Sequence, residues 1–189
     1  MAHWKLDETD GDIAFDSVSG EDALVIGDPF WQPISGIVDG DLEFDGTDYF
    51  VNTDFVLNPA DGPLSVFAWV QDGAPGQTVI SQFNGANWLA TDSALRCLTT
   101  ELCSSGRGGI PLLSAANITD GSWHRIGFVW DGAYRVLYVD DAPVAENTQR
   151  DLEGCVDGLN IGGGTDSAAG TYWSGMIDNV RIYNRAVNP

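Results

Sequence analysis

The chain has 189 residues, of which 43% are hydrophobic, and it contains seven Trp, eight Phe and five Tyr. This length and composition suit one domain with a substantial core and exclude a disordered chain. The 28 acidic and eight basic residues give a net charge of −20, which makes nucleic acid and anionic lipid surfaces poor partners.

Short apolar or alternating runs bounded by Gly, Asp and Pro predict strand after strand. In the first half of the chain they lie at residues 4–6, 23–26, 42–44, 49–51, 64–70, 78–81, 88–90 and 94–98. Residues 45–48 contain an Asp-Gly pair and join two of these strands as a hairpin. Residues 64–70 are apolar on both faces, so we expect a central strand that another layer covers.

The second half of the chain continues in the same way. Further strands are expected at residues 110–113, 121–130, 134–139, 142–148, 158–162 and 173–183. Tight turns at Asp131-Gly132 and Asp140-Asp141 join the three middle strands. No segment sustains helical spacing, so the sequence predicts an all-β sandwich over residues 1–189 as a single domain. Because the chain starts directly in a strand, we expect it to be excised from a longer protein.

Several blocks, in order, resemble the laminin-G-like domains of the concanavalin A-like lectin/glucanase superfamily. They are residues 2–8 with 14–17, 41–51, 64–70, the meander at 121–141 and the closing strand at 175–186. The resemblance implies a two-sheet antiparallel jelly roll, concanavalin A-like, with adjacent termini. It says little about the ligand, because a fold does not fix a function.

The resemblance also implies a structural calcium site, with Asp16 and Asp178 as its best ligands. Ca²⁺ takes six to eight oxygens from carboxylates and carbonyls, which a Gly/Asp-rich loop and an Asp of the last strand can supply. Asp10, Asp12 and Asp45 are weaker candidates. The alternatives are a turn-forming role for Asp16 and a solvent-facing strand position for Asp178. Residues 16–22 carry more acids than the family's usual loop, which leaves the ligand set open.

Catalytic motifs are not found in the sequence. Many glucanases of this superfamily carry Glu-x-Asp-x-x-Glu on one strand, and the nearest series here, Glu43, Asp45 and Asp48, is interrupted by a turn. Neither His lies near a Ser or Cys motif for nucleophilic catalysis. We therefore expect a non-catalytic chain.

Aromatic residues beside turns are candidates for stacking on sugar rings. They are Trp31, Trp88, Tyr172 and Trp173, and the alternative for each is packing under a loop. Trp69, Trp123 and Trp130 lie in strong strand runs and are expected in the core. Two arginines, Arg96 and Arg107, could donate hydrogen bonds to hydroxyls or carboxylates, or serve only as local counter-charges.

The three cysteines allow at most one internal disulfide. Cys97 and Cys103 could close a small loop, which would leave Cys155 free. The alternative is three reduced and packed thiols. With only two His in the chain, a zinc site is not expected.

The favoured function is a non-catalytic binding module for a polysaccharide or glycan, with structural Ca²⁺. The first alternative is a protein-interaction or adhesion module, and the second is a polysaccharide hydrolase or lyase. The resemblance implies an extracellular or cell-surface location. No apolar run approaches the roughly 20 residues that span a bilayer, so we expect no membrane insertion.

Overall fold

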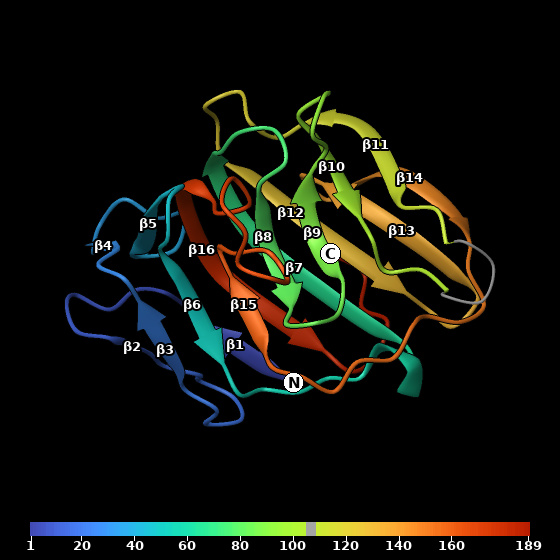
Figure 1. Ribbon diagram of the computed structural model, residues 1–189, viewed down its shortest axis with the longest axis horizontal. Helices are drawn as coiled ribbons and strands as arrows, with labels where there is room; N and C mark the ends of the chain where they lie inside the picture. The colour runs from blue at the N-terminus through green and yellow to red at the C-terminus, as the bar shows by residue number, and fades with distance from the viewer. Residues whose placement is uncertain (105–108) are drawn as a thin grey trace.

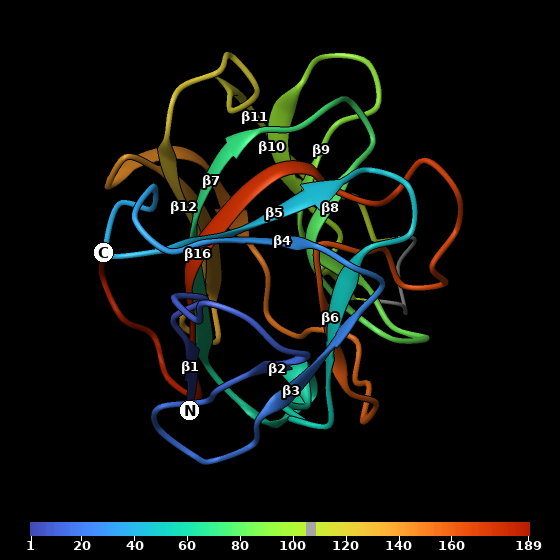
Figure 2. The same cartoon turned by 90° about the vertical axis from the view of Figure 1, so that its left-hand side faces the viewer.

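The computed structural model describes residues 1–104 and 109–189, and it consists of two antiparallel sheets packed face to face (Figure 1). Figure 2 shows the two layers side by side, with β7 and β12 in one and β6 and β8 in the other. The predicted all-β, two-sheet antiparallel sandwich is therefore confirmed. Among the described residues the helical structure is one 3₁₀ turn, η1 (Pro59–Asp61), and no helix there is long and apolar enough to cross a membrane.

The first sheet, sheet A, is centred on β7 and β16. Its order is β14 (Ala142–Thr148), β13 (Tyr134–Val139), β12 (His124–Trp130), β7 (Leu64–Asp72), β16 (Ser174–Tyr183), β5 (Asp41–Asp45) and β4 (Phe30–Gln32). The first strand, β1 (Ala2–Trp4), pairs with the second half of β16. This pairing brings the two ends of the chain together, as predicted (Figure 2).

The second sheet, sheet B, covers the inner face of sheet A. Its order is β11 (Leu112–Asn117), β10 (Cys97–Thr100), β9 (Asn87–Thr91), β8 (Thr78–Gln82), β15 (Leu159–Ile161), β6 (Phe50–Thr53), β3 (Ala23–Ile26) and β2 (Ile13–Ala14). The predicted strand at 94–98 begins only at Cys97. Asp92 Oδ1 accepts hydrogen bonds from the amides of Ala94 and Leu95, and Arg96 has a φ of 60°, so these residues form a turn.

The alternation of side chains along β7 defines the two faces of sheet A. Leu64, Val66, Ala68 and Val70 belong to the core between the sheets. The intervening residues point to the opposite side of the strand, because successive side chains of a strand alternate. The outer face of sheet A, the side away from sheet B, thus receives Phe67 and Trp69. The layer expected to cover this strand is sheet B, and it covers only the side of β7 that faces the core.

Candidate functional site

A cavity of about 240 Å³ is hollowed into the outer face of sheet A, and we call it the face pocket. It is built mainly on the three central strands β7, β12 and β16, with one residue from the loop before β5 and one from the turn before β14. Its lining residues are Val38, Phe67, Ala68, Trp69, Arg125, Asp141, Asn179 and Arg181. Two aromatic rings and two guanidinium groups therefore converge on one small space.

Strand register explains this convergence. Trp69 of β7 pairs with Arg125 on β12 and with Asp178 on β16. Two residues earlier on β7, Phe67 pairs with Gly127 and Arg181. Both arginines thus flank the aromatic pair from opposite sides of β7, at positions that share the outer face.

Gly127 makes room for the Phe67 ring. A Cβ at this position would overlap the Phe67 ring, so only glycine lets the ring lie over β12. The Arg125 guanidinium then covers the ring, with Cζ 5.1 Å from its centroid, and Phe67 is only 3% exposed. This geometry is a cation–π contact.

The turn between β13 and β14 holds Arg125 in place. Arg125 Nη1 donates to Asp141 Oδ1 at 2.6 Å, and its backbone amide donates to Asp140 Oδ1. Asp140 and Asp141 have φ angles of 52° and 65°, as the primed turn of a tight hairpin requires. His124 lies between two carboxylates, with Nδ1 2.9 Å from Asp140 and Nε2 3.2 Å from Asp120.

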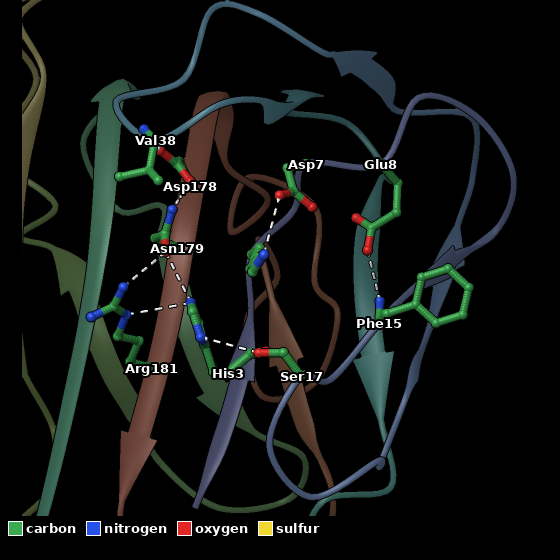
Figure 3. Close-up of polar contacts among 10 residues, drawn as sticks. His3, Asp7, Glu8, Phe15, Ser17, Val38, Asp178, Asn179 and Arg181 are labelled. Atoms are coloured by element: carbon green, nitrogen blue, oxygen red, sulfur yellow. Dashed lines mark hydrogen bonds and ion pairs between the residues drawn. The ribbon is translucent and has the colours of Figure 1, made fainter.

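Arg181 belongs to a polar network that joins β16 to β1 (Figure 3). Its Nη2 donates to Asn179 Oδ1 at 3.2 Å, and its Nε donates to His3 Nε2 at 3.3 Å. Burial and the nearby Arg181 charge lower the pKa of His3, against the opposing effect of its hydrogen bond with Asn179. His3 Nε2 also lies 2.9 Å from Asn179 Oδ1, so the tautomer of the ring decides whether this nitrogen donates or accepts. His3 Nδ1 lies 3.1 Å from Ser17 Oγ. Within the described ranges, no carboxylate lies within ion-pair distance of Arg181.

Asp178 fixes the loop that walls the pocket. Its Oδ2 accepts hydrogen bonds from the amides of Ile37 and Val38, at 2.9 and 3.0 Å, and its Oδ1 accepts from Asn179 Nδ2 (Figure 3). Asp178 is fully buried, and burial raises its pKa to about 6. The proposed solvent-facing position of Asp178 is therefore wrong: the loop before β5 covers this carboxylate.

A second buried carboxylate, Asp41, lies near Asp178. It raises the pKa of Asp178, and its own pKa is raised by burial. Asp41 Oδ1 is buried without a hydrogen-bond partner. A Cβ at Gly36 would overlap the Gly40 carbonyl oxygen and lie 3.0 Å from Asp178 Oδ2, so Gly36 packs closely against both oxygens. Carboxylate and carbonyl oxygens are the donors that Ca²⁺ prefers.

Asp16 lies elsewhere and has a different set of contacts. It bridges to Trp4, so β1 separates it from β16 and Asp178. Both of its oxygens accept hydrogen bonds from the protein, from the amides of His3, Val18 and Ser19 and from Ser19 Oγ. Burial raises its pKa, but these hydrogen bonds outweigh burial and lower it overall. The structure therefore gives Asp16 the alternative turn-forming role and does not bring it together with Asp178.

The other predicted calcium ligands are not gathered either. Asp10, Asp12 and Asp45 are exposed. In the described part of the chain, no cluster brings together three or more His, Cys, Asp or Glu side chains suited to a metal ion.

The four aromatics predicted beside turns are all buried, and Trp31, Trp88 and Trp173 belong to the hydrophobic core. Trp88 and Trp173 are fully buried, and Trp31 and Tyr172 are 8% and 7% exposed. Trp31 Nε1 donates to the Gly11 carbonyl, and Tyr172 Oη donates to that of Ser167. None of these rings offers a free face to a sugar.

The prediction that the strand tryptophans lie in the core is wrong for two of the three. Trp130 is buried, as predicted, but Trp69 and Trp123 are only partly buried. Trp69 lines the face pocket, and neither lies in the core between the sheets. Phe67, Arg125 and Arg181 were not predicted as site residues. Alternation along β7 could have placed Phe67 and Trp69 on the face opposite Leu64, Val66 and Ala68. The two arginines join them only through the pairing of β12 and β16 with β7.

The remaining predicted residues lie apart from the pocket. Arg96 is exposed in the turn before β10, and Arg107 lies outside the described residues. Cys97, Cys103 and Cys155 are all free thiols, so the Cys97–Cys103 disulfide is not formed and the alternative of reduced cysteines applies. Burial raises the pKa of the Cys103 thiol.

A family model described as the concanavalin A-like lectin/glucanases superfamily matches residues 44–189. The match covers most of the chain, which therefore belongs to this superfamily. Comparison with the sequences of curated proteins gives no significant match.

Solved structures share the fold at low sequence identity. The binding domain of Paraclostridial Mosquitocidal Protein 1 has a TM-score of 0.77 at 10% identity, over 99% of this chain and 49% of that one. Domain 4 of AbnA, an extracellular GH43 arabinanase from Geobacillus stearothermophilus solved with arabinotriose, has a TM-score of 0.69 at 16% identity, over 98% and 92%. The ligand-binding domain of botulinum neurotoxin D, solved with N-acetylneuraminic acid, has a TM-score of 0.71 at 13% identity, over 99% and 48%.

The lengths of these relatives differ from that of this chain. It spans about half of the two toxin binding domains and 31% of a Trypanosoma rangeli sialidase mutant that also matches. Binding domains are thus prominent among the structures that this chain resembles.

Proposed function

We propose that this member of the concanavalin A-like lectin/glucanases superfamily is a non-catalytic carbohydrate-binding module whose ligand sits in the face pocket. The observation that carries this proposal is the partly exposed Trp69 within a cavity flanked by Arg125 and Arg181. A flat aromatic surface packs against the C–H face of a pyranose, while guanidinium and amide groups donate to its hydroxyls.

The size and chemistry of the face pocket suit one or two sugar rings. Its volume of about 240 Å³ lies just below the roughly 300–1,000 Å³ of clefts that enclose drug-sized ligands. Asn179, fixed by Arg181 and Asp178, adds a polar group at its edge. Two of the similar structures were solved with an arabinotriose and with N-acetylneuraminic acid, which supports a sugar ligand in this fold.

The test is a glycan array followed by titration calorimetry on the best ligand, with Trp69→Ala as the key variant. We expect this variant to lose at least tenfold in affinity while keeping the melting temperature of the wild type. Tyr134→Ala is the matched control, because Tyr134 is an exposed aromatic on β13 that does not line the pocket. If Trp69→Ala keeps the full affinity, the ligand does not bind in the face pocket.

A protein partner is the second candidate, and exposed apolar side chains favour it. Seven of them lie between residues 15 and 38: Phe15, Val18, Leu24, Phe30, Ile34, Ile37 and Val38. Such side chains mark an interaction surface where they form one contiguous patch. Silence on the glycan array, together with capture of a partner that Phe30→Asp abolishes, would favour this function over the first.

A hydrolase or lyase needs carboxylates that converge on the substrate. The carboxylate among the pocket's lining residues is Asp141, and it is bound to Arg125. Sustained release of reducing ends by the repurified protein, abolished by Asp141→Asn, would overturn the non-catalytic assignment.

We also propose that Ca²⁺ binds beside Asp178, with Asp41 and the Gly40 carbonyl as further oxygen ligands. The unpartnered Asp41 Oδ1 and the burial of both carboxylates support this placement. Millimolar Ca²⁺ should raise the melting temperature beyond the effect of NaCl at equal ionic strength, because a cation that binds only the folded chain stabilises it. Asp178→Asn should remove this increment and Asp16→Asn should retain it. The reverse result would return the site to Asp16.

An extracellular location is part of the same proposal. The arabinanase with a domain of this fold is extracellular by its description, and a glycan partner would be met outside the cell. Immunolocalisation of the full-length protein on intact cells tests this location.

A further inference from the structure

We propose that the face pocket selects sugars that carry a carboxylate, and that Arg181 is the residue that binds this group. This inference rests on the proposed carbohydrate-binding function and names its ligand class.

The charge of Arg181 is not compensated within the pocket. Its guanidinium donates to Asn179 Oδ1 and lies 3.3 Å from His3 Nε2, and no ion pair of the described residues includes it. The chain as a whole carries 28 acidic residues against eight basic ones. Arg181 is therefore a positive charge without an ion-pair partner, in a pocket of a protein whose net charge is strongly negative.

Three other basic residues have different partners for their charged groups. Lys5 pairs with Asp7, and Arg125 pairs with Asp141. Arg135 is buried and donates to the carbonyls of Leu102 and Ile110 and to Asn147 Oδ1. Arg181 shares the lack of a carboxylate partner with Arg135 and, among the described residues, with the exposed Arg96, Arg150 and Arg185. It differs from these residues because it is partly exposed and lines the face pocket.

The geometry leaves Arg181 with free N–H groups that can donate hydrogen bonds to a carboxylate. Two of its nitrogens, Nε and Nη2, are engaged by the protein, which holds the planar group in one orientation. The five N–H donors of a guanidinium exceed these two contacts, so its remaining donors are available to an anion. An Arg–carboxylate pair is stronger and more directional than a hydrogen bond between neutral groups.

The aromatic pair supplies the second half of an acidic-sugar site. Phe67 pairs directly with Arg181 across the strands, and Trp69 lies two residues along β7 on the same face. A ring that stacks on Trp69 can therefore direct a carboxylate towards β16. Because the net charge of −20 repels long polyanions, a short acidic oligosaccharide fits this site better than a densely charged polymer.

The experiment compares matched acidic and neutral sugars by titration calorimetry. The probes are a galacturonic acid trisaccharide with its methyl ester, and sialyllactose with lactose. We expect the wild type to bind at least one acid ten times more tightly than its neutral counterpart, and the arms show whether a uronic or a sialic acid is preferred. Arg181→Gln should abolish this preference. Arg96→Gln removes one exposed positive charge that does not line the pocket, and it should retain the preference.

Arg181→Lys keeps the charge but loses the planar donor fork, so it should retain only part of the preference. It also keeps the test decisive if Arg181→Gln does not fold. Equal affinity for acid and ester, with Trp69→Ala weakening both, would overturn the inference and leave the carbohydrate function standing. An acid preference that survives in Arg181→Gln would overturn the role of Arg181. If none of the glycans binds, both proposals fail together.

Discussion

In two regions of this molecule, the rim at Gly73 and the outer face of sheet A at Gly127, a glycine makes room for an aromatic ring. The consequences differ between the two regions. At the rim, a Cβ at Gly73 would overlap Trp173, whose ring is fully buried in the core. On the outer face of sheet A, Gly127 makes room for Phe67, and the cover over that ring is the guanidinium of Arg125. A ring covered by packed apolar groups contributes to stability. A ring covered by a charged side chain instead positions that guanidinium beside a cavity.

Replacing the two tryptophans gives the largest contrast. Trp173→Ala should lower the free energy of unfolding by about 3–5 kcal/mol, because it leaves a cavity in a closed core. Trp69→Ala should change it by less than about 1 kcal/mol, because the ring is partly exposed and lies outside the core. Urea denaturation measures both. Similar losses for the two variants would show that the face pocket is as much a part of the core as the rim.

Gly127→Ala tests the device on the outer face. The added methyl group overlaps the Phe67 ring and should cost about 1–3 kcal/mol of unfolding free energy, as overpacking does. It should also displace Arg125 and abolish sugar binding. In the double variant with Phe67→Leu, the smaller side chain should recover stability but not binding. If Gly127→Ala alone binds as the wild type does, the placement of Arg125 over Phe67 is not needed for the ligand.

Much of the fold could be predicted from the sequence, because alternation and turn residues are local signals. The hairpin at Asp131-Gly132 is an example. The hairpin expected at residues 45–48 is wrong, because β5 lies in sheet A and β6 in sheet B, so this turn connects the two sheets. The site was harder, because sequence context does not show which layers cover a residue. Trp173 lies beside a Gly-rich loop but is closed off by Gly73 and the core, whereas Trp69 lies in an apolar strand with one open face. The role of Arg181 depends on strand pairings with residues far away in the chain.

The buried carboxylate that anchors the pocket wall should make stability depend on pH. Burial raises the pKa of Asp178 to about 6 in the folded chain, above its usual value near 4. The folded state therefore holds a proton that the unfolded state releases between these values. This group should lower the free energy of unfolding as the pH rises from about 4 to 6, by about 3 kcal/mol, with no further change above.

Denaturation in chelator across this pH range, with Asp178→Asn as the reference, measures the effect. The amide side chain keeps an acceptor for Ile37 and Val38 but does not titrate there, so the slope from this group should vanish. An unchanged slope in Asp178→Asn would assign the pH dependence to other groups and leave Asp178 ionised in the fold.

The smallest effect is expected at the turn that holds Arg125. Burial lowers the pKa of His124, but hydrogen bonds to Asp140 and Asp120 outweigh burial and raise the pKa above its usual value. The protonated ring thus stabilises the folded chain. This contribution is fully present below about pH 6.5 and is lost as the pH rises through the raised pKa. It should be less than about 1 kcal/mol, because the pair lies near the surface.

His124→Gln should remove this pH dependence, and the difference in unfolding free energy between it and the wild type between pH 6 and 8 measures it. This window lies above that of Asp178, so the two titrations can be separated in one series. A difference that grows as the pH rises would mean that the neutral ring is the preferred form. The Asp140-Asp141 turn would then hold Arg125 over Phe67 without help from a charge on His124.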